Sequence, residues 1–595
     1  MAGREAGVDH GHGRPGAACD RVRGIGLDHR EVPLLRVERG VGGLRQGREH
    51  GHRDHRQEEP PHLSQWWQAN VDTSLSRFAK VVILAERDYI AAVNDRVIVF
   101  DGGMGATLEQ FDLTEEDYGG LKGKCHEALI LHRPDVIEGV HTEMVEAGAE
   151  VVETDTFQAS RIKLEEWGLE DHTLEINIKA AEIARKAVGE DRFVAGSIGP
   201  TGHLPASDDP TLGKITVSEL ITVFEEQARG LIEGGSDLLI IETAQDILEV
   251  KAAIFGAREA FKATGKTLPL QISVSLLPNG GKMLLGTDIE AVLAIIGGLD
   301  VDVLGLNCST GPEDMRDAIR YLGENSHLPV HCIPNAGIPH QGPDGETIFP
   351  EEPDPLADAL QQFVERFGVG IVGGCCGTTP DHIRAIVDRV GGRKAEPRPE
   401  KGPPRLASMM TASDIVQEPA PTIVGERVNS QGSRKAKELL LADDYDGLLQ
   451  VAEDQVEGGA HVLDLCVALT ERQDEDEQMR QLVKRISLTQ PAPLQIDTTE
   501  PDVMKVALEQ NPGRAVINSV NLEAGRDKLD LVTPLAKAHG AALLALTIDE
   551  ESMAKTKQRK LDVAKRIYGY AVDEHGLDPE LLIFDALTFT LATGS

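Results

Sequence analysis

The feature that most constrains the fold is a regular alternation of short apolar runs with amphipathic segments in the first two thirds of the chain. The apolar runs are typical of buried strands, and the segments between them repeat apolar residues with the helical period. The predicted strands are residues 97–103, 150–157, 193–200, 238–246, 270–276, 303–310, 330–337 and 369–377. Parallel strands that alternate with crossover helices favour an eight-stranded barrel. We therefore predict an α/β fold, a (β/α)₈ TIM barrel, over residues 76–393.

A second series of the same kind follows residues 394–420, which are rich in proline and charge and which we expect to be a linker. Its predicted strands are residues 421–429, 461–468, 493–499, 515–521, 542–549 and 581–590. A barrel of this type needs about eight strands, and this series supplies six. We therefore expect residues 421–595 to form a second (β/α)₈ barrel that is truncated at its C-terminal end.

The N-terminal segment differs from the rest of the chain. Residues 1–62 are rich in Arg, His and Gly, contain no Lys, and show no sustained strand or helix period. We expect residues 1–75 to be a disordered extension, or a translation of sequence upstream of the true start. Regular patterning begins with a predicted helix over residues 76–96.

Charge and cysteine content narrow the function classes. The formal net charge of −38 argues against nucleic acid or an anionic membrane as a partner. The chain has no apolar run of membrane-spanning length and no secretion signal pattern. Its seven cysteines are sparse and unevenly spaced, which does not resemble a disulfide framework. These features predict a protein of the reducing cytoplasm.

Three cysteines lie at predicted strand ends. Cys375 and Cys376 stand side by side in "IVGGCCGTTP", at the end of the eighth predicted strand, and Cys308 ends the sixth. The carboxyl ends of barrel strands meet at one mouth, where (β/α)₈ enzymes place their working residues. Three thiolates with a fourth position open are typical of a catalytic zinc site that activates a substrate thiol. The alternative is a glycine-rich turn in which the paired cysteines are small buried residues.

The other cysteines are weaker candidates. Cys332 lies on the seventh predicted strand, but earlier relative to the strand end, so it is a spare candidate ligand. We interpret Cys19, Cys125 and Cys466 as structural or incidental.

Two acidic residues also lie near the carboxyl ends of predicted strands. Asp101 lies near the end of the first predicted strand and Glu242 near the end of the fourth, so both carboxylates are candidates to bind the ammonium group of an amino-acid substrate. The backbone N–H groups of Gly102 and Gly103 are candidates to bind the substrate carboxylate. For Asp101, which precedes two glycines, simple turn chemistry is the alternative.

Motifs from both series resemble known families. The first barrel resembles the homocysteine S-methyltransferases over about residues 85–390, in "FDGGMGAT", "ETDTF", "GSIGPTG", "IIET", "GLNCSTGPEDM" and "GGCCGTTPDHI". The second resembles the pterin-binding barrel of cobalamin-dependent methionine synthases, in "VGERVNSQGSRKAKELL", "IDTTEPDVMKVAL", "INSVNLEAG" and "IFDALTFTLATG". The order of the two barrels is also the order in that family.

The resemblance of the first barrel implies a zinc-dependent reaction. It implies that Cys308, Cys375 and Cys376 hold Zn²⁺, and that Asp101 and Glu242 bind homocysteine. The homocysteine thiolate would attack a methyl group carried on cobalamin and form methionine.

The resemblance of the second barrel implies the methyl donor. In this family 5-methyltetrahydrofolate gives its methyl group to cobalamin and leaves as tetrahydrofolate. The family's pterin contacts fall on Asp497, Asn518 and Asp585.

One departure from the family limits the expected activity. We find no D-x-H-x-x-G segment that would ligate cobalt, so we expect methylcobalamin on a separate domain or protein. The chain then corresponds to the substrate-binding half of such an enzyme. One alternative is a cobalamin-independent homocysteine S-methyltransferase that uses betaine or S-methylmethionine. Another is a non-catalytic module that binds folate or a thiol. The pterin-like second barrel argues against the first alternative, and methionine formation from any donor would exclude the second.

Overall fold

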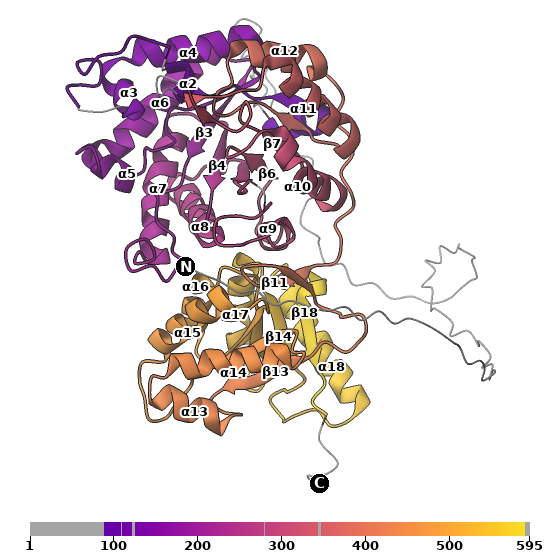
Figure 1. The fold of residues 1–595 in the computed structure, drawn as a ribbon. Helices are drawn as coiled ribbons and strands as arrows, with labels where there is room; N and C mark the ends of the chain where they lie inside the picture. The colour runs from indigo at the N-terminus through magenta and orange to yellow at the C-terminus, as the bar shows by residue number, and fades with distance from the viewer. Residues whose placement is uncertain (1–87, 109, 122–124, 279, 343–346, 589–595) are drawn as a thin grey trace, which may run out of the picture. The chain divides into compact units, whose positions relative to one another are not determined.

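The computed structural model describes residues 88–108, 110–121, 125–278, 280–342 and 347–588. The predicted extension, residues 1–75, and most of the predicted helix 76–96 lie outside the described residues. The described elements form two successive α/β barrels, coloured from indigo to red-brown and from orange to yellow in Figure 1.

The first barrel contains one eight-stranded sheet in which neighbouring strands run parallel in the order β1-β10-β7-β6-β5-β4-β3-β2. A parallel bridge between Phe100 and Val151 joins the two ends of this order and closes the sheet. Its strands are β1 (Ile98–Val99), β2 (Val151–Glu153), β3 (Phe193–Ile198), β4 (Leu238–Ala244), β5 (Leu270–Val274), β6 (Val303–Asn307), β7 (Val330–Ile333) and β10 (Ile371–Val372). The predicted TIM barrel is confirmed.

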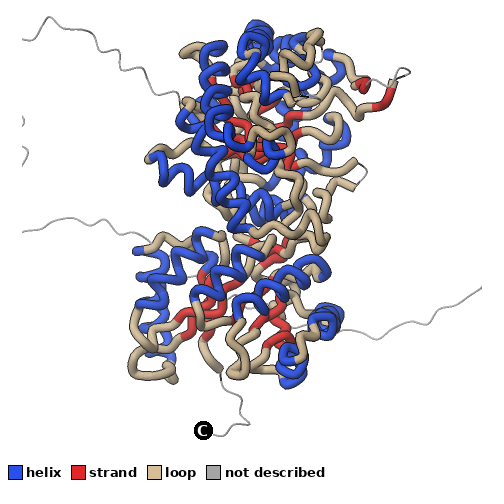
Figure 2. Tube along the Cα trace, turned by 90° about the vertical axis from the view of Figure 1, so that its left-hand side faces the viewer, coloured by secondary structure: helices blue, strands red, loops and turns tan. Residues whose placement is uncertain are grey.

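Helices surround this sheet, as the blue and red tubes of Figure 2 show. They are α1 (Tyr89–Asp95), α2 (Met104–Leu108), α3 (Leu129–His132), α4 (Pro134–Ala147), α5 (Arg161–Glu165), α6 (Thr173–Val188), α7 (Val217–Glu233), α8 (Ile247–Thr264), α9 (Ile289–Ile296), α10 (Pro312–Asn325), α11 (Pro353–Phe367) and α12 (Pro380–Val390). Both α10 and α12 begin at a proline, which suits the first helical position because its missing N–H has no partner there.

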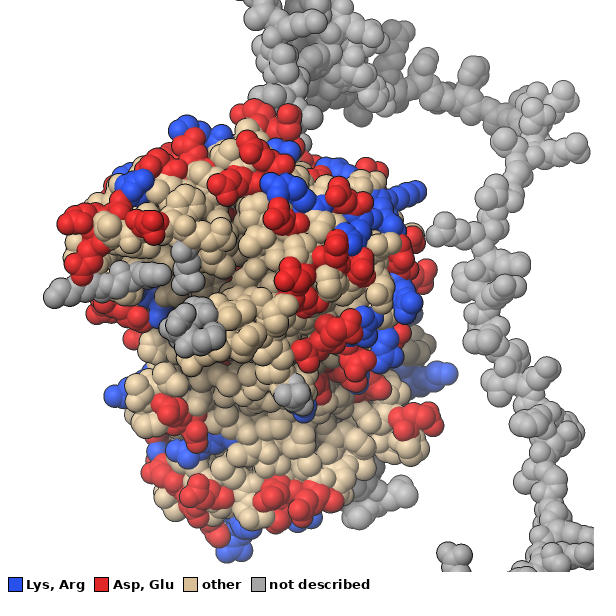
Figure 3. All heavy atoms as spheres, turned by 45° about the horizontal axis from the view of Figure 1, so that its top comes forward, with Lys and Arg blue, Asp and Glu red and all other residues tan. Residues whose placement is uncertain are grey.

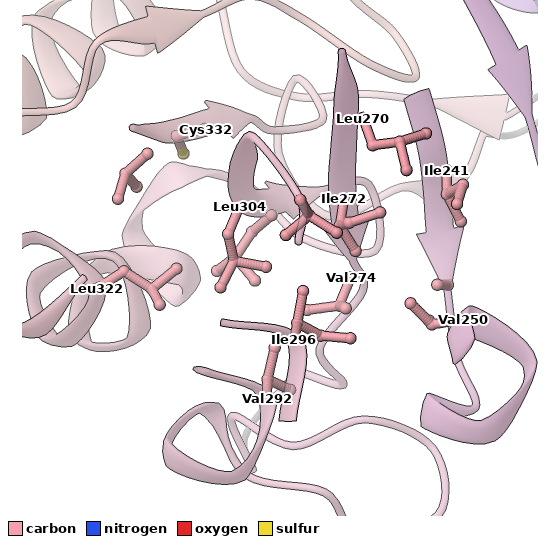
Figure 4. Close-up of a cluster of buried hydrophobic side chains, with 14 of the residues drawn as sticks. Ile241, Val250, Leu270, Ile272, Val274, Val292, Ile296, Leu304, Leu322 and Cys332 are labelled. Carbon is pink, nitrogen blue, oxygen red and sulfur yellow. The ribbon is translucent and has the colours of Figure 1, made fainter. Parts of the chain in front are cut away.

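The strands are buried on both faces because their side chains alternate between two apolar layers. On β4, Leu238 and Ile240 point into the barrel, whereas Leu239 and Ile241 pack toward the helices. Figure 4 shows the outer layer, where Ile241, Leu270 and Leu304 meet side chains such as Val292 of α9. Tyr89 of α1 joins the inner layer, and its hydroxyl donates to Gln271 Oε1 at 2.7 Å.

The second barrel contains a six-stranded parallel sheet in the order β13-β14-β15-β16-β17-β18. Its strands are β13 (Val424–Asn429), β14 (Val462–Cys466), β15 (Leu494–Asp497), β16 (Val516–Val520), β17 (Ala542–Leu546) and β18 (Leu582–Asp585). Its helices are α13 (Arg434–Leu441), α14 (Tyr445–Glu457), α15 (Glu475–Thr489), α16 (Pro501–Gln510), α17 (Asp527–Ala538) and α18 (Lys557–Tyr568). Within the described residues this sheet stays open between β13 and β18, as the count of predicted strands implied.

Two short hairpins were not predicted. One pairs β8 (His340–Gln341) with β9 (Thr347–Ile348), after β7. The other pairs β11 (Arg405–Ala407) with β12 (Ala412–Asp414), within residues 394–420. The second hairpin forms because Leu406 and Ala407 are buried, so this part of the proline-rich segment has apolar surface to pack.

The helices and the charged surface agree with what the sequence composition predicted about membranes and charge. Among the described residues, none of the helices combines the length and apolar character that a bilayer crossing requires. On the face shown in Figure 3, acidic and basic side chains are interspersed around a broad uncharged area. The negative charge is therefore not gathered into one patch on this face.

Candidate active site and metal centre

A cavity of about 550 Å³ opens at the carboxyl ends of the first barrel's strands. Residues from the ends of β1, β2, β4, β6 and β10 line it, and they include Asp101, Glu153, Glu242, Cys308 and Cys375. Among the described residues, no Lys or Arg lines this cavity. The cavity therefore favours a ligand that carries positive charge.

The three predicted cysteines converge in this cavity. The sulfur atoms of Cys308 and Cys376 are 3.8 Å apart, those of Cys375 and Cys376 are 4.0 Å apart, and all three lie within 4.8 Å of one another. A tetrahedral zinc ion with Zn–S bonds of about 2.3 Å needs sulfur atoms about 3.8 Å apart. The donor set and its spacing therefore fit a zinc ion with a fourth position open.

The thiols of this cluster affect one another's ionisation. Hydrogen bonds from Cys375 and Cys376 lower the pKa of Cys308 to about 3. The contact with Cys308 raises the pKa of Cys376 to about 12, and the contacts with Cys308 and Cys376 hold the pKa of Cys375 well above its usual range. A thiolate on Cys308 thus opposes ionisation of its two neighbours. A bound dication would remove this conflict, because it stabilises all three thiolates together.

Loop backbone fixes the cysteine positions. Cys308 lies one residue beyond β6 in a left-handed conformation with φ of 60°, and its N–H donates to Ile333 O at 3.2 Å. The N–H of Cys375 donates to Pro334 O at 2.8 Å, and the N–H of Cys376 donates to Asn335 Oδ1 at 3.1 Å. The last residue of β7 and the loop after it therefore hold both cysteine-bearing segments.

The two acidic candidates are buried at the cavity wall. Asp101 is 4% exposed and its Oδ2 accepts from Glu153 N at 3.1 Å. Glu242 is 6% exposed and accepts hydrogen bonds from Ser197 Oγ and from Asn307 Nδ2. Burial raises the pKa of Glu242 to about 7, and burial together with the charge of Glu242 raises the pKa of Asp101. A cationic group bound between them would stabilise their charged forms.

The candidate glycines pack against the cysteine loop. The N–H of Gly103 donates to Thr378 Oγ1 at 3.0 Å, so this amide already has a partner. The N–H of Gly102 has no hydrogen-bond acceptor among the described residues. Of the two candidate amides, Gly102 is therefore the one that remains available to a ligand.

Gly103→Ala should lower the stability of the first barrel. An added Cβ would lie 2.6 Å from the carbonyl oxygen of Cys375, so backbone would have to move. We expect a loss of about 1–3 kcal/mol in the free energy of unfolding, measured by denaturant titration. Gly105→Ala is the control, because its Cβ would meet only the His126 ring at 3.3 Å. Equal stability of the two variants would contradict the close approach of the two loops.

The remaining predicted cysteines lie apart from the cluster. Cys332 is fully buried, its thiol contacts Met315 Sδ at 3.8 Å, and Figure 4 shows it among apolar side chains. Cys125 lines the cavity but is not part of the sulfur cluster, and Cys466 is buried in the second barrel. Cys19 lies outside the described residues.

Two site residues were missed from the sequence. Asn307 directly precedes Cys308 and bonds to Glu242, and Glu153 lines the cavity from the end of β2. Both lie in motifs that were singled out, "GLNCST" and "ETDTF", so their position at strand ends was the available signal.

In the second barrel, two of the three predicted pterin contacts share one polar network. Asn429 Nδ2 donates to Asp464 Oδ2 at 2.6 Å and to Asp497 Oδ2 at 2.8 Å, and Asn518 Nδ2 lies 3.4 Å from Asp464 Oδ1. Asp585 instead accepts from the N–H of Leu587 in its own turn, at 2.7 Å. Sequence reasoning missed two residues of this network. Asn429 is the last residue of β13, and Asp464 lies in the middle of the apolar strand β14.

Comparisons with known proteins agree with the motifs. The sequence model of the homocysteine S-methyltransferase family matches residues 98–390, and that of the pterin binding enzymes matches residues 425–595. Methionine synthase of Mycobacterium tuberculosis (strain ATCC 25618 / H37Rv) is 39% identical over 520 residues, which is 86% of this chain and 43% of the relative. Methionine synthase of Mycobacterium leprae (strain TN) is 39% identical over 523 residues, with the same two shares. The chain thus spans less than half the length of these relatives.

Among solved structures, the metallated homocysteine methyltransferase MmuM of Escherichia coli is 26% identical, with a TM-score of 0.40. That alignment covers 49% of this chain and 96% of MmuM. Residues 98–390 thus form a domain of the homocysteine S-methyltransferase family, and residues 425–595 match the pterin binding enzymes.

Proposed function

We propose that this chain is the substrate-binding half of a cobalamin-dependent methionine synthase. The first barrel binds homocysteine, and the second binds 5-methyltetrahydrofolate. Cobalamin, on a domain or protein beyond the described residues, would carry the methyl group between them. The observation that carries the proposal is the cluster of three sulfur atoms beside the buried carboxyl groups of Asp101 and Glu242 in one cavity.

Cys308, Cys375 and Cys376 would hold the zinc ion. Bound there, zinc would take the homocysteine sulfur in its open position and lower the pKa of that thiol, which makes a nucleophile near neutral pH. The loop hydrogen bonds to the backbone of Cys375 and Cys376 keep the ligands fixed while the substrate binds.

The cavity wall would orient the amino-acid end of homocysteine. The carboxylates of Asp101 and Glu242 pair with its ammonium group, because no Lys or Arg in the described lining of the cavity competes for them. The free N–H of Gly102 donates to its carboxylate, with Gly103 beside it. These contacts hold the sulfur at the cysteine cluster and leave one side of it open to the methyl donor.

In the second barrel, Asp497, Asn518 and Asp585 would bind the pterin. Burial, and then the charge of Asp464, raise the pKa of Asp497 to about 6. A carboxyl group with that pKa can hold a proton near neutral pH. Methyl transfer from N5 of the pterin needs such a proton, since a tertiary amine is a poor leaving group.

The reducing cytoplasm suits this site, since it keeps the three thiols available for metal. The ligands we propose are small molecules, homocysteine and 5-methyltetrahydrofolate, and the partner is a cobalamin-binding domain or protein. We propose no role for nucleic acid or membrane.

A donor comparison tests the proposal. The purified full chain, loaded with zinc and kept reduced, should form methionine from homocysteine and methylcobalamin. With 5-methyltetrahydrofolate as the only methyl source, methionine should form only when cobalamin is added and kept reduced. Product is measured by chromatography against a no-protein control, because free methylcobalamin reacts slowly with thiols.

Other donors identify the alternatives. Methionine from S-methylmethionine or betaine without cobalamin would make the chain a cobalamin-independent methyltransferase. Homocysteine binding without methionine from any donor would make it a thiol-binding module.

A further inference from the structure

Asn307 lies between the cysteine cluster and the buried carboxyl group of Glu242. It is the last residue of β6, directly precedes Cys308, and is 1% exposed. Its amide has hydrogen-bond partners on β4 and β5 and in the loop that carries Cys375. Neither the zinc ligands nor the homocysteine contacts proposed above include it.

The orientation of this amide is fixed by its oxygen. Asn307 Oδ1 accepts from the backbone N–H of Thr243 at 2.8 Å and from Ser273 Oγ at 2.7 Å. A backbone N–H only donates, so the atom that faces Thr243 N is the amide oxygen. The amide nitrogen is thereby directed to the opposite side.

A buried histidine strengthens this assignment. His331 Nε2 lies 2.8 Å from Ser273 Oγ, and the one hydroxyl hydrogen of Ser273 goes to Asn307 Oδ1. His331 Nε2 therefore carries the hydrogen and donates it to Ser273. A chain of donors from His331 through Ser273 holds the oxygen of Asn307 in place.

The amide nitrogen then faces both parts of the site. Asn307 Nδ2 is 2.9 Å from Glu242 Oε2, 2.9 Å from Thr243 Oγ1, and 3.9 Å from Cys375 Sγ. Two hydrogens serve these three acceptors, and a charged carboxylate or thiolate accepts more strongly than a hydroxyl. The same amide group therefore lies between the carboxylate that faces the cavity and a sulfur of the cluster.

We propose that Asn307 is a positioning residue that fixes the Glu242 carboxylate relative to the Cys375 sulfur. It thereby sets the distance between the ammonium site and the thiol site that a bound aminothiol must span. This inference rests on the proposed function. It predicts selectivity for thiols that carry an ammonium group at the homocysteine spacing over thiols that lack one.

Asn307→Asp tests the hydrogen-bond donors of this amide, because it removes the Nδ2 hydrogens and keeps the acceptor oxygen. The substitution keeps the shape and an acceptor oxygen for Thr243 N and Ser273 Oγ, but replaces the N–H donors that face Glu242 and Cys375. The matched control is Asn177→Asp, since Asn177 is fully buried in the same barrel and its Nδ2 donates to Ala159 O and Thr173 O.

The first readout compares two thiols on the zinc-loaded full chain. Homocysteine carries an ammonium group, and 4-mercaptobutanoic acid is the same molecule without it. We expect Asn307→Asp to weaken homocysteine binding by about 10- to 100-fold. This is the typical effect of losing a residue that hydrogen-bonds to a metal-binding side chain and orients it. Binding of 4-mercaptobutanoic acid should change several-fold less. Equal losses for the two thiols would overturn the inference.

The second readout is spectroscopic and needs no substrate. With Co²⁺ in place of zinc, thiolate-to-metal charge-transfer absorption reports the surroundings of the sulfur ligands. Asn307→Asp should shift this absorption and Asn177→Asp should not. An unchanged spectrum in Asn307→Asp would overturn the contact with Cys375, and an equal shift in the control would reduce the effect to general destabilisation, which also overturns it.

The wild-type chain separates this inference from the proposed function. If it binds neither Co²⁺ nor homocysteine, the proposed function fails and the inference fails with it. If it binds both, only the variants decide the role of Asn307. Should Asn307→Asp not fold, Asn307→Ser replaces it in both measurements, with the same comparison of the two thiols.

Discussion

Cys375→Ser should remove the bound metal and the activity together. A serine hydroxyl does not ionise near neutral pH, so the substitution removes one of three thiolates that lie within 4.8 Å of one another. We expect zinc to fall from about one per chain toward zero. Methyl transfer from methylcobalamin to homocysteine should fall by more than about 100-fold. Mutation of a residue that only hydrogen-bonds to a metal ligand already lowers activity or metal affinity by about 10- to 100-fold. Metal analysis and the methionine assay on the same preparation measure both.

Cys332→Ala is the matched control for this prediction. Cys332 is a fully buried cysteine of the same barrel, and its thiol contacts Met315 rather than the cluster. This variant should lose some stability, because it leaves a small cavity in an apolar layer, but it should keep its zinc. Zinc retained by Cys375→Ser would reduce "GGCCG" to a structural turn. Zinc lost equally from both variants would point to general unfolding.

The barrel architecture was predictable because burial on two faces leaves a strong mark in sequence. Strands such as β4 and β6 are continuous apolar runs, since one layer of side chains fills the barrel and the other meets the helices. All predicted strands except residues 421–429 were longer at their carboxyl ends than the observed ones. Residues such as Cys308, expected at the end of a strand, lie in the loop just beyond it.

The contacts between loops were not predictable in the same way. That Gly103 N–H would donate to Thr378, 275 positions away, depends on how β1 and β10 pair and where their loops turn. Asn307 was equally hidden, because its partners come from β4, β5 and the loop after β10. Sequence pattern assigns residues to strand ends, but only the closed sheet determines which ends face one another.

In the second barrel the strands were predictable from the sequence, whereas the contacts of its buried polar residues were not. Its six strands and their parallel order follow from apolar runs separated by helical segments. Asp464 interrupts such a run at a position that is 1% exposed, and an isolated buried acid in a strand does not reveal its partners. Its acceptor role toward Asn429 and Gln495 emerges only from the register of β13, β14 and β15.

Glu242→Gln should separate substrate binding from metal binding. The Glu242 carboxyl group is 6% exposed, lines the cavity, and lies on the side of Asn307 that faces the cysteine cluster. Removal of its charge leaves the substrate ammonium with a weaker partner in a largely desolvated site, where loss of one partner of a buried charge pair costs about 2–5 kcal/mol. We expect the dissociation constant of homocysteine to rise by about 30-fold or more, with zinc content unchanged.

A second glutamate provides the control for Glu242→Gln. Glu249 of α8 is similarly buried and accepts from Thr201 N and Oγ1, at 2.9 and 2.6 Å, but it does not line the large cavity. Glu249→Gln should leave the affinity for homocysteine within about 3-fold of the wild type, because a buried hydrogen bond alone is worth about 1 kcal/mol. Loss of zinc from Glu242→Gln would show that Glu242 acts by holding the cysteine loop. Unchanged homocysteine affinity with zinc in place would remove Glu242 from the substrate site and leave Asp101 as the ammonium partner.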